Sequence, residues 1–182
     1  SGSRSISATM ASRMGGLMLG YAQKEGISAL YGAKLAFFLG ADECDFGKFV
    51  GFKVYIGHHG DQGAHHADVV LPGASYAEKS GTWVNLEGRV QRGERAVFAP
   101  GDARDDWTIL RALSEKLGKT LPFDTLEELR AAMAVDCPDL ANVGLVSFAW
   151  NPPALDAKAE GVIAGYPIKD FYLTNVICRA SP

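Results

Sequence analysis

Short apolar runs bounded by glycine or proline dominate the hydrophobic pattern in the first half of the chain. Three such runs occur in order, at residues 35–39 (Leu-Ala-Phe-Phe-Leu), 54–56 (Val-Tyr-Ile) and 69–71 (Val-Val-Leu). Runs this short, with no polar position on either face, predict strands of a parallel sheet that are buried on both faces. Residues 41–52, which separate the first two strands, are at the lower limit of length for a crossover helix.

A β-hairpin is predicted directly after the third strand. Pro72-Gly73 ends that strand, and residues 74–79 predict a polar turn that Gly81 terminates. The stretches 82–85 and 89–91 then flank Leu-Glu-Gly, in which Gly88 can supply the positive φ of a hairpin turn. Residues 96–98 are a candidate extension of the second arm.

The apolar spacing changes to a helical period after residue 105. Residues 107–117 predict a helix with its leucines and isoleucine on one face, two aspartates at its start and Gly118 after its end. Residues 126–134 predict a second helix, for which Thr125 and Glu128 form a capping box. A short helix is possible over residues 27–31. The fold class predicted is α/β: a Rossmann-like, mostly parallel sheet fragment with a β-hairpin, two helices and a long irregular C-terminal tail.

Three segments are predicted along the chain. Residues 1–10 form a flexible N-terminal segment, residues 11–138 the α/β domain, and residues 139–182 an extended tail. The first segment is rich in Ser, contains Arg and lacks acids, which is typical of a mitochondrial transit segment, although a plain flexible tail has the same composition. We expect the tail to be anchored by its apolar residues Phe171, Tyr172 and Leu173.

Composition narrows the possible functions. The 182 residues are 47% hydrophobic, enough for a sizeable core, and the net charge of −3 gives no electrostatic reason to expect nucleic acid. No apolar run reaches the roughly 18 residues that a membrane span needs. The three cysteines, Cys44, Cys137 and Cys178, are far apart. They therefore predict neither a disulfide framework nor the four ligands of an iron–sulfur cluster.

The four histidines of the chain form one cluster. They are His58, His59, His65 and His66, and Asp61 and Asp68 are close by in the sequence. Imidazole and carboxylate groups bind transition metals. Adjacent histidines in a glycine-rich loop point in divergent directions, however, and this spacing matches no standard zinc motif. We therefore predict no metal site, and we interpret the loop as packing against a neighbour or lining a vestigial cofactor crevice.

The polar residues between positions 75 and 95 allow a chemical and a structural interpretation. They are Ser75, Glu78, Ser80, Glu87, Arg89, Arg92 and Arg95. The two glutamates could act as an acid–base pair, but we favour structural roles, with Glu78 capping a turn and Glu87 in the hairpin loop. The arginines could bind phosphate, but a solvated or ion-paired strand face is the simpler interpretation, with the first and third on one side of a regular strand. The serines lack a nucleophile elbow. We expect no catalytic, cofactor-binding or metal-binding residue in this chain.

Several separate motifs resemble one known family. They are Gly-His-His-Gly-Asp at 57–61, Ala-Asp-Val-Val-Leu-Pro at 67–72, Glu-Lys-Ser-Gly-Thr at 78–82, Asn-Leu-Glu-Gly-Arg-Val-Gln at 85–91, Pro-Gly-Asp-Ala-Arg-Asp-Asp-Trp at 100–107, Ile-Lys-Asp-Phe-Tyr-Leu-Thr-Asn at 168–175 and Arg-Ala-Ser at 179–181. Through them the chain resembles the molybdopterin oxidoreductase superfamily. Within it, the chain is most similar to the large iron–sulfur subunit of respiratory complex I, the NADH:ubiquinone oxidoreductase. The resemblance runs from about residue 11 to residue 182.

The resemblance implies a structural, non-redox part of the peripheral arm of complex I, an enzyme that transfers electrons from NADH to ubiquinone with proton translocation. It implies that the iron–sulfur clusters lie in an N-terminal part of the subunit that this chain does not contain, so that no cofactor is expected here. The partners it implies are other complex I subunits, especially a chain carrying that N-terminal part. The location it implies is the matrix side of the mitochondrial inner membrane, or the cytoplasmic side of a bacterial membrane.

Two other functions fit parts of the pattern. The first is a fragment of a working molybdopterin-dependent oxidoreductase, in which residues 73–85 contact the pterin. The second is an independent small-molecule-binding Rossmann-like domain, which is supported only by the polar residues at the ends of the strands. The motif Asp-Phe-Tyr-Leu-Thr at 170–174 favours complex I over both.

Overall fold

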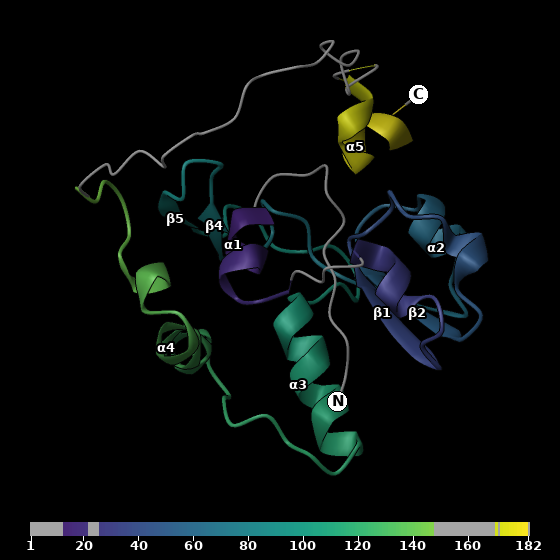
Figure 1. Ribbon diagram of the computed structural model, residues 1–182, viewed down its shortest axis with the longest axis horizontal. Coiled ribbons are helices and arrows are strands. Elements are labelled where there is room, and N and C mark those ends of the chain that lie inside the picture. Colours follow the sequence, from purple (N-terminus) through teal and green to yellow (C-terminus); the bar gives the residue numbers. More distant parts are fainter. Residues whose placement is uncertain (1–12, 22–25, 148–169, 171, 182) are drawn as a thin grey trace, which may run out of the picture.

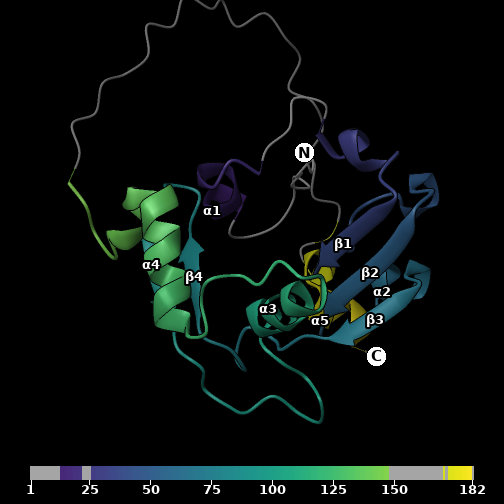
Figure 2. The ribbon, with the colours of Figure 1, turned by 90° about the horizontal axis from the view of Figure 1, so that it is seen from below.

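The protein was analysed as a computed structural model, which describes residues 13–21, 26–147, 170 and 172–181. The predicted flexible segment 1–10 lies outside these residues. The helices are α1 (Arg13–Met18), α2 (Gln62–His66), α3 (Asp106–Lys116), α4 (Leu126–Asp136) and α5 (Val176–Ala180). The strands are β1 (Leu35–Leu39), β2 (Phe52–Gly57), β3 (Val69–Pro72), β4 (Gly81–Val84) and β5 (Val90–Gly93). The three-stranded sheet lies at one side of the molecule, the hairpin with α1 and α4 at the other, and α3 between them (Figures 1 and 2).

The sheet confirms the three predicted strands and the α/β fold class. Its order is β1-β2-β3, and both pairings are parallel. The short connection between β1 and β2 carries only a 3-10 turn, η2 (Phe46–Lys48), while α2 connects β2 to β3. A second 3-10 turn, η1 (Gly26–Leu30), precedes β1 and confirms the short helix expected there.

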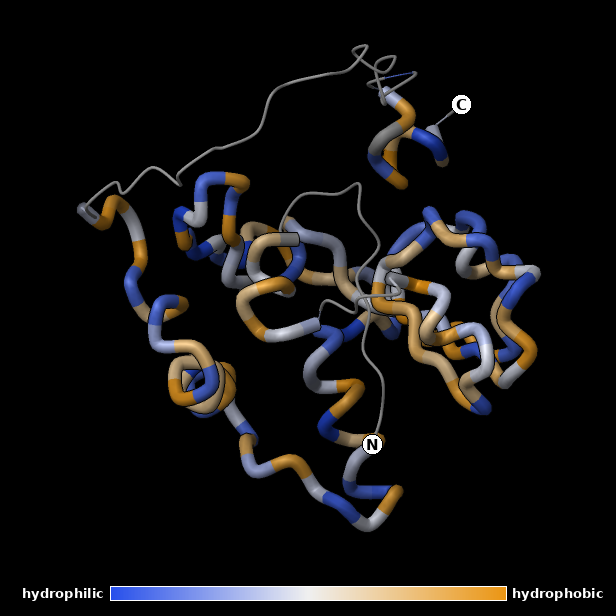
Figure 3. The backbone as a smooth tube through the Cα atoms, viewed as in Figure 1, coloured by the Kyte–Doolittle hydropathy of each residue, from blue (hydrophilic) through white to orange (hydrophobic). Residues whose placement is uncertain are grey.

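The prediction that the strands are buried on both faces is confirmed for the middle of the central strand β2, where Val54, Tyr55 and Ile56 are 7%, 1% and 1% exposed, and is wrong for the outer strands β1 and β3. One face packs Ala36, Phe38 and Tyr55 against residues of η1, η2 and α2. On the opposite face, which we call the open sheet face, apolar side chains remain between 36% and 49% exposed: Leu35, Phe37, Leu39, Phe52 and Val69. The turns η1 and η2 and the helix α2 pack on the first face, whereas on the open sheet face Val54 and Ile56 are buried and the exposed residues lie on β1, on β3 and at the start of β2. Figure 3 shows the hydropathy of each residue along this backbone.

The hairpin forms as predicted, but its second arm is shorter. β4 and β5 pair antiparallel with Val84 opposite Val90, and Gly88 in the turn has a φ of 84°. The extension over residues 96–98 is wrong. The N–H groups of Ala96 and Val97 both donate to the carbonyl oxygen of Ala77, at 2.9 and 3.1 Å, so the chain leaves the hairpin after Gly93.

Both predicted helices of the second half are present. Gly118 follows α3 with a φ of 72°, and α4 begins with the complete capping box of Thr125 and Glu128. A second core lies between the hairpin, α1 and α4, formed by Val84, Val90 and Leu140, with methionines of α1 and α4 packed against it. The helix α1, which seals this core, was not predicted.

The C-terminal segment is not anchored in the way that its apolar residues predict. Phe171 lies outside the described residues, and Tyr172 and Leu173 are 80% and 53% exposed. The segment instead forms a 3-10 turn, η4 (Tyr172–Thr174), and the helix α5, whose N-cap Asn175 accepts a hydrogen bond from the N–H of Ile177. Among the described residues, no helix has the length and apolarity needed to cross a membrane.

Candidate functional site at the carboxyl edge of the sheet

The carboxyl ends of the three parallel strands lead into polar loops. These loops are residues 40–45 after β1, 58–61 after β2 and 73–80 after β3. In open parallel α/β sheets, ligands bind outside this edge. The side chains of the three loops therefore form the candidate functional site.

A buried aspartate holds the first two loops together. Asp42 is 6% exposed, and its carboxylate accepts hydrogen bonds from the Tyr55 hydroxyl at 3.0 Å and from the Gly63 N–H at 2.8 Å. Burial, with the Asp42 charge second, raises the pKa of the Tyr55 phenol, which keeps its proton as a donor. A side chain on residue 63 would place its Cβ 2.3 Å from the Tyr55 ring, so this contact requires glycine.

An arginine from the C-terminal segment contacts the same edge. The Nε of Arg179 donates to Asp61 at 2.6 Å, its Nη2 to Glu43 at 3.1 Å, and its Nη1 to the carbonyl oxygen of Leu173 at 2.8 Å. These three charged side chains are only 15–26% exposed. Figure 2 shows α5 beside the sheet. No local sequence pattern indicates this contact, because its partners are 118 and 136 residues apart.

A second polar cluster lies where β2 and β3 lead toward α3. Lys79 forms an ion pair with Asp106 at 2.5 Å, and the Nδ1 atoms of His58 and His59 are 2.5 Å apart. Burial lowers the pKa of His58, and the neighbouring His59 and Lys79 lower it further. His58 is therefore neutral at pH 7.

The other two histidines have separate neighbours. His66 contacts the carbonyl oxygen of Gln62 through its Nδ1 at 2.8 Å and stacks on Phe46 at 5.4 Å, while His65 is exposed. Asp68 accepts a hydrogen bond from the Lys53 N–H at 2.7 Å. Within the described ranges, no three His, Cys, Asp or Glu side chains are grouped as metal ligands.

We therefore predict that the loop from His58 to His66 binds no transition metal. Elemental analysis of the purified protein should find zinc and iron at the same level in the wild type and in a variant carrying His58→Ala and His65→Ala. The double variant is the control for metal bound elsewhere in an assembly. One metal ion per chain in the wild type, lost in the variant, would overturn the prediction.

The loop after β3, proposed from the resemblance as a pterin contact, uses its polar groups internally. The Ser75 N–H donates to Glu78, the Ala74 N–H to the Arg104 carbonyl oxygen, and the Ser80 hydroxyl to Glu94. Lys79 is paired with Asp106. An anionic pterin needs free donors, and these four groups are already engaged within the chain. They are therefore not available to such a cofactor.

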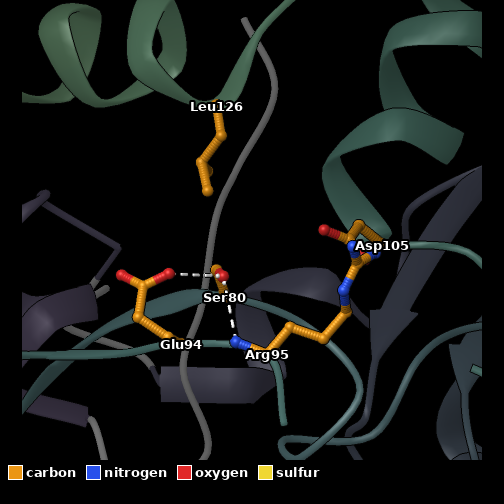
Figure 4. Close-up of a pocket in the computed structure, with 5 residues that line it drawn as sticks. All are labelled: Ser80, Glu94, Arg95, Asp105 and Leu126. Carbon is orange, nitrogen blue, oxygen red and sulfur yellow. Dashed lines mark hydrogen bonds between the residues drawn. The ribbon is translucent and has the colours of Figure 1, made fainter. Parts of the chain in front are cut away.

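A shallow pocket of about 340 Å³ lies between the hairpin, α3 and α4. Its lining residues are Ser80, Glu94, Arg95, Asp105 and Leu126 (Figure 4). Ser80 bridges two of them, since its hydroxyl donates to Glu94 at 2.9 Å and accepts from the Arg95 N–H at 3.1 Å. The two carboxylates of Glu94 and Asp105 outweigh the single positive charge of Arg95, so the pocket does not favour an anion.

The remaining polar residues singled out in the sequence belong to the hairpin and to the turn before it. Arg92 pairs with Thr82 in the hairpin, whereas Arg89 and Arg95 fall outside β5, so the three arginines do not form one regular strand face. Arg95 lies over the Phe98 ring at 4.8 Å. Glu87 lies in the hairpin turn, where its N–H donates to Asn85, while Glu78 serves the turn before the hairpin.

The three cysteines are free thiols. Cys44 is half-buried next to the acidic first loop, and burial together with the Asp42 charge raises its pKa to about 11. Such a thiol stays protonated at neutral pH.

Comparisons with known proteins divide the chain into two parts. Residues 2–116 match the family model described as molybdopterin oxidoreductase, and residues 141–182 match a family model for the C-terminal region of an NADH-ubiquinone oxidoreductase subunit. The chain is 41% identical over 187 residues to the 75 kDa subunit of NADH-ubiquinone oxidoreductase from Reclinomonas americana. It is 43% identical over 188 and 164 residues to the mitochondrial 78 kDa subunits of Neurospora crassa and Candida albicans.

These alignments cover 95%, 94% and 82% of this chain. They cover only 26%, 25% and 23% of the three relatives. The chain thus spans about a quarter of the length of the curated relatives that it matches.

Proposed function

Because the chain belongs to the molybdopterin oxidoreductase family, in the branch of the large subunit of NADH-ubiquinone oxidoreductase, we propose that it is a structural part of that subunit in the peripheral arm of complex I. In this role it contributes scaffold and assembly surface. The complex as a whole transfers electrons from NADH to ubiquinone and couples this to proton translocation. The chemistry takes place on other parts of the assembly.

The open sheet face carries the proposal. A sheet that binds only a small molecule at its carboxyl edge has both faces covered by its own helices. Here the apolar side chains Leu35, Phe37 and Leu39 of β1 are 49%, 36% and 47% exposed. Each large apolar side chain contributes about 1.5–3 kcal/mol when it is fully buried. A partner that completes the burial of this face therefore gains several kcal/mol.

Large parts of the relatives do not align with this chain, and we propose that the companion polypeptide corresponds to one of these parts. The chain aligns with about a quarter of each relative. We propose that a polypeptide carrying the N-terminal part of the same subunit covers the open sheet face, and that other complex I subunits surround the pair. We propose that the iron–sulfur clusters belong to that N-terminal part, because each cluster needs about four ligands and the three cysteines of this chain are far apart. We propose that this chain holds neither a cluster nor a pterin, and that none of its residues is catalytic.

The names of the relatives from Neurospora crassa and Candida albicans include the word mitochondrial. By extension we propose the matrix side of the mitochondrial inner membrane for this chain. In a bacterium the equivalent place is the cytoplasmic side of the membrane.

A charge on the open sheet face should prevent assembly. We expect Phe37→Lys to reduce recovery of the companion chain, when this chain is affinity-purified from its native source, by at least tenfold. Phe37 is 36% exposed, so the substitution also removes some packing within the chain, and circular dichroism of the purified variant must show that it is still folded. The readout is the amount of companion polypeptide per mole of this chain, measured by quantitative mass spectrometry.

Leu86→Lys is the matched control, because Leu86 is 89% exposed in the hairpin turn, away from the sheet. It should leave recovery unchanged. Equal recovery with Phe37→Lys and with the control would rule out the open sheet face as the assembly surface. If the co-purifying polypeptides were those of a molybdenum-dependent enzyme and not complex I subunits, the complex I assignment itself would be wrong.

A further inference from the structure

We infer that the carboxyl edge of the sheet is a built binding site for a guanidinium-bearing peptide, and that its occupant is the chain's own C-terminal segment, residues 172–181. The scaffold role described above does not require this contact. The site consists of the carboxylates of Asp61 and Glu43, and the ligand group is the guanidinium of Arg179.

The two carboxylates come from different loops that the fold fixes relative to each other. Glu43 follows β1 and Asp61 follows β2. Between them, the buried Asp42 accepts hydrogen bonds from both Tyr55 on β2 and Gly63 on α2. This clamp sets the separation of the loops before any ligand arrives. Pre-organisation of this kind reduces the entropy lost on binding.

The guanidinium fits the pair through its own geometry. Its planar fork directs separate N–H groups at separate acceptors, which a lysine ammonium cannot do in the same fixed arrangement. Nε bonds Asp61 at 2.6 Å and Nη2 bonds Glu43 at 3.1 Å. The 2.6 Å contact is short for an N–H···O bond, as expected for a charge-assisted pair.

The segment that carries the arginine is folded around it. Nη1 donates back to the Leu173 carbonyl oxygen at 2.8 Å, and Asn175 caps the helix in which Arg179 lies. Tyr172 and Leu173 are mostly exposed, and the apolar residues Val176 and Ile177 of α5 are only partly buried. We infer that the ion pairs of Arg179 are the main contact that holds the segment in place. Partly buried ion pairs leave an uncompensated charge when one partner is removed, which makes the contact sensitive to single substitutions.

The occupied edge is the one at which parallel α/β sheets take small ligands. In this chain the C-terminal segment fills that position at its β1–β2 side. The site is therefore specific for an arginine-containing peptide, and it joins the end of the chain to the loops after β1 and β2.

Hydrogen–deuterium exchange of the full chain in its purified assembly tests this. We expect Arg179→Gln to accelerate exchange at the α5 amides about tenfold, and Asp61→Asn to do the same from the other side. Arg179→Lys keeps the charge but lacks the fork, so an intermediate acceleration is expected. Because the two groups form one contact, the double variant should exchange no faster than either single variant.

Arg104→Gln is the matched control, since Arg104 is exposed and donates only to the adjacent Ala103 carbonyl oxygen among the contacts described for its side chain. It should leave α5 unchanged. Slow exchange in the β4–β5 hairpin reports that each variant is folded. If Arg179→Gln accelerates α5 but Asp61→Asn does not, the arginine acts only within its own helix and the binding site does not exist. Unchanged exchange in both variants would also rule out the binding site.

Discussion

Expressed without a companion, this chain should aggregate, or should melt without a cooperative transition. The open sheet face leaves five large apolar side chains between 36% and 49% exposed, and the outer edges of β1 and β3 have no strand partner within the described sheet. Leaving even a few hundred Å² of such surface in water forgoes several kcal/mol at about 25 cal/mol per Å². The total stability of a typical domain is only about 5–15 kcal/mol, so this deficit is decisive.

Size-exclusion chromatography and thermal denaturation of the isolated chain are the measurements. Co-expression with the N-terminal part of the subunit is the control, and it should restore a soluble species with a sharp transition. Visible absorbance from iron–sulfur clusters should appear only in the co-expressed sample. A soluble monomer with a sharp melting transition would show that the open sheet face needs no partner, and cluster absorbance that follows the isolated chain would show that it holds a redox centre.

Gly63→Ala should be among the most damaging glycine-to-alanine substitutions in the described part of the chain. The added Cβ would lie 2.3 Å from Cε2 of Tyr55 and 2.9 Å from the carbonyl oxygen of Ala41. Tyr55 is 1% exposed and its hydroxyl is bonded to Asp42, so the ring has no room to move. Overpacking of this kind typically costs about 1–3 kcal/mol, occasionally more. The better helix propensity of alanine, about 1 kcal/mol, offsets only part of this cost.

The measurement is the melting temperature of the co-purified assembly, which we expect to fall by several degrees or to be unmeasurable because no assembly is recovered. Gly60→Ala is the matched control from the same loop, because its added Cβ meets no atom within 4 Å and its φ is not positive. It should be neutral. Equal melting temperatures for the two variants would mean that α2 does not pack on Tyr55 as described.

The local pattern of the sequence was sufficient for most elements of this fold. The three strands were visible as apolar runs, and Gly88, Gly118 and the Thr125 capping box each marked a backbone feature that the structure contains. Each of these signals lies within a few residues of the element it specifies. The helix α1 escaped prediction because Gly15 and Gly16 interrupt its helical signal.

Features that depend on distant partners could not be read in this way. The strand β1 is apolar at every position, and the sequence alone does not say which polypeptide covers its second face. The hairpin ends earlier than predicted because the N–H groups of Ala96 and Val97 donate to the carbonyl oxygen of Ala77, nearly twenty residues upstream. At the candidate site, the sequence indicates Asp61 only as a possible metal ligand and Arg179 only as part of a family motif. Nothing in the local spacing of either residue indicates an ion pair between them.

The ion pair of Asp61 and Arg179 also sets an order of events during synthesis. The two residues are 118 positions apart, so the sheet and both of its loops leave the ribosome well before the arginine does. At about 5–20 residues per second, this interval is on the order of ten seconds. The contact between α5 and the sheet is consequently among the last to form. During those seconds Asp61 and Glu43 have no arginine to pair with, so the loops after β1 and β2 must keep their positions through the Asp42 hydrogen bonds alone.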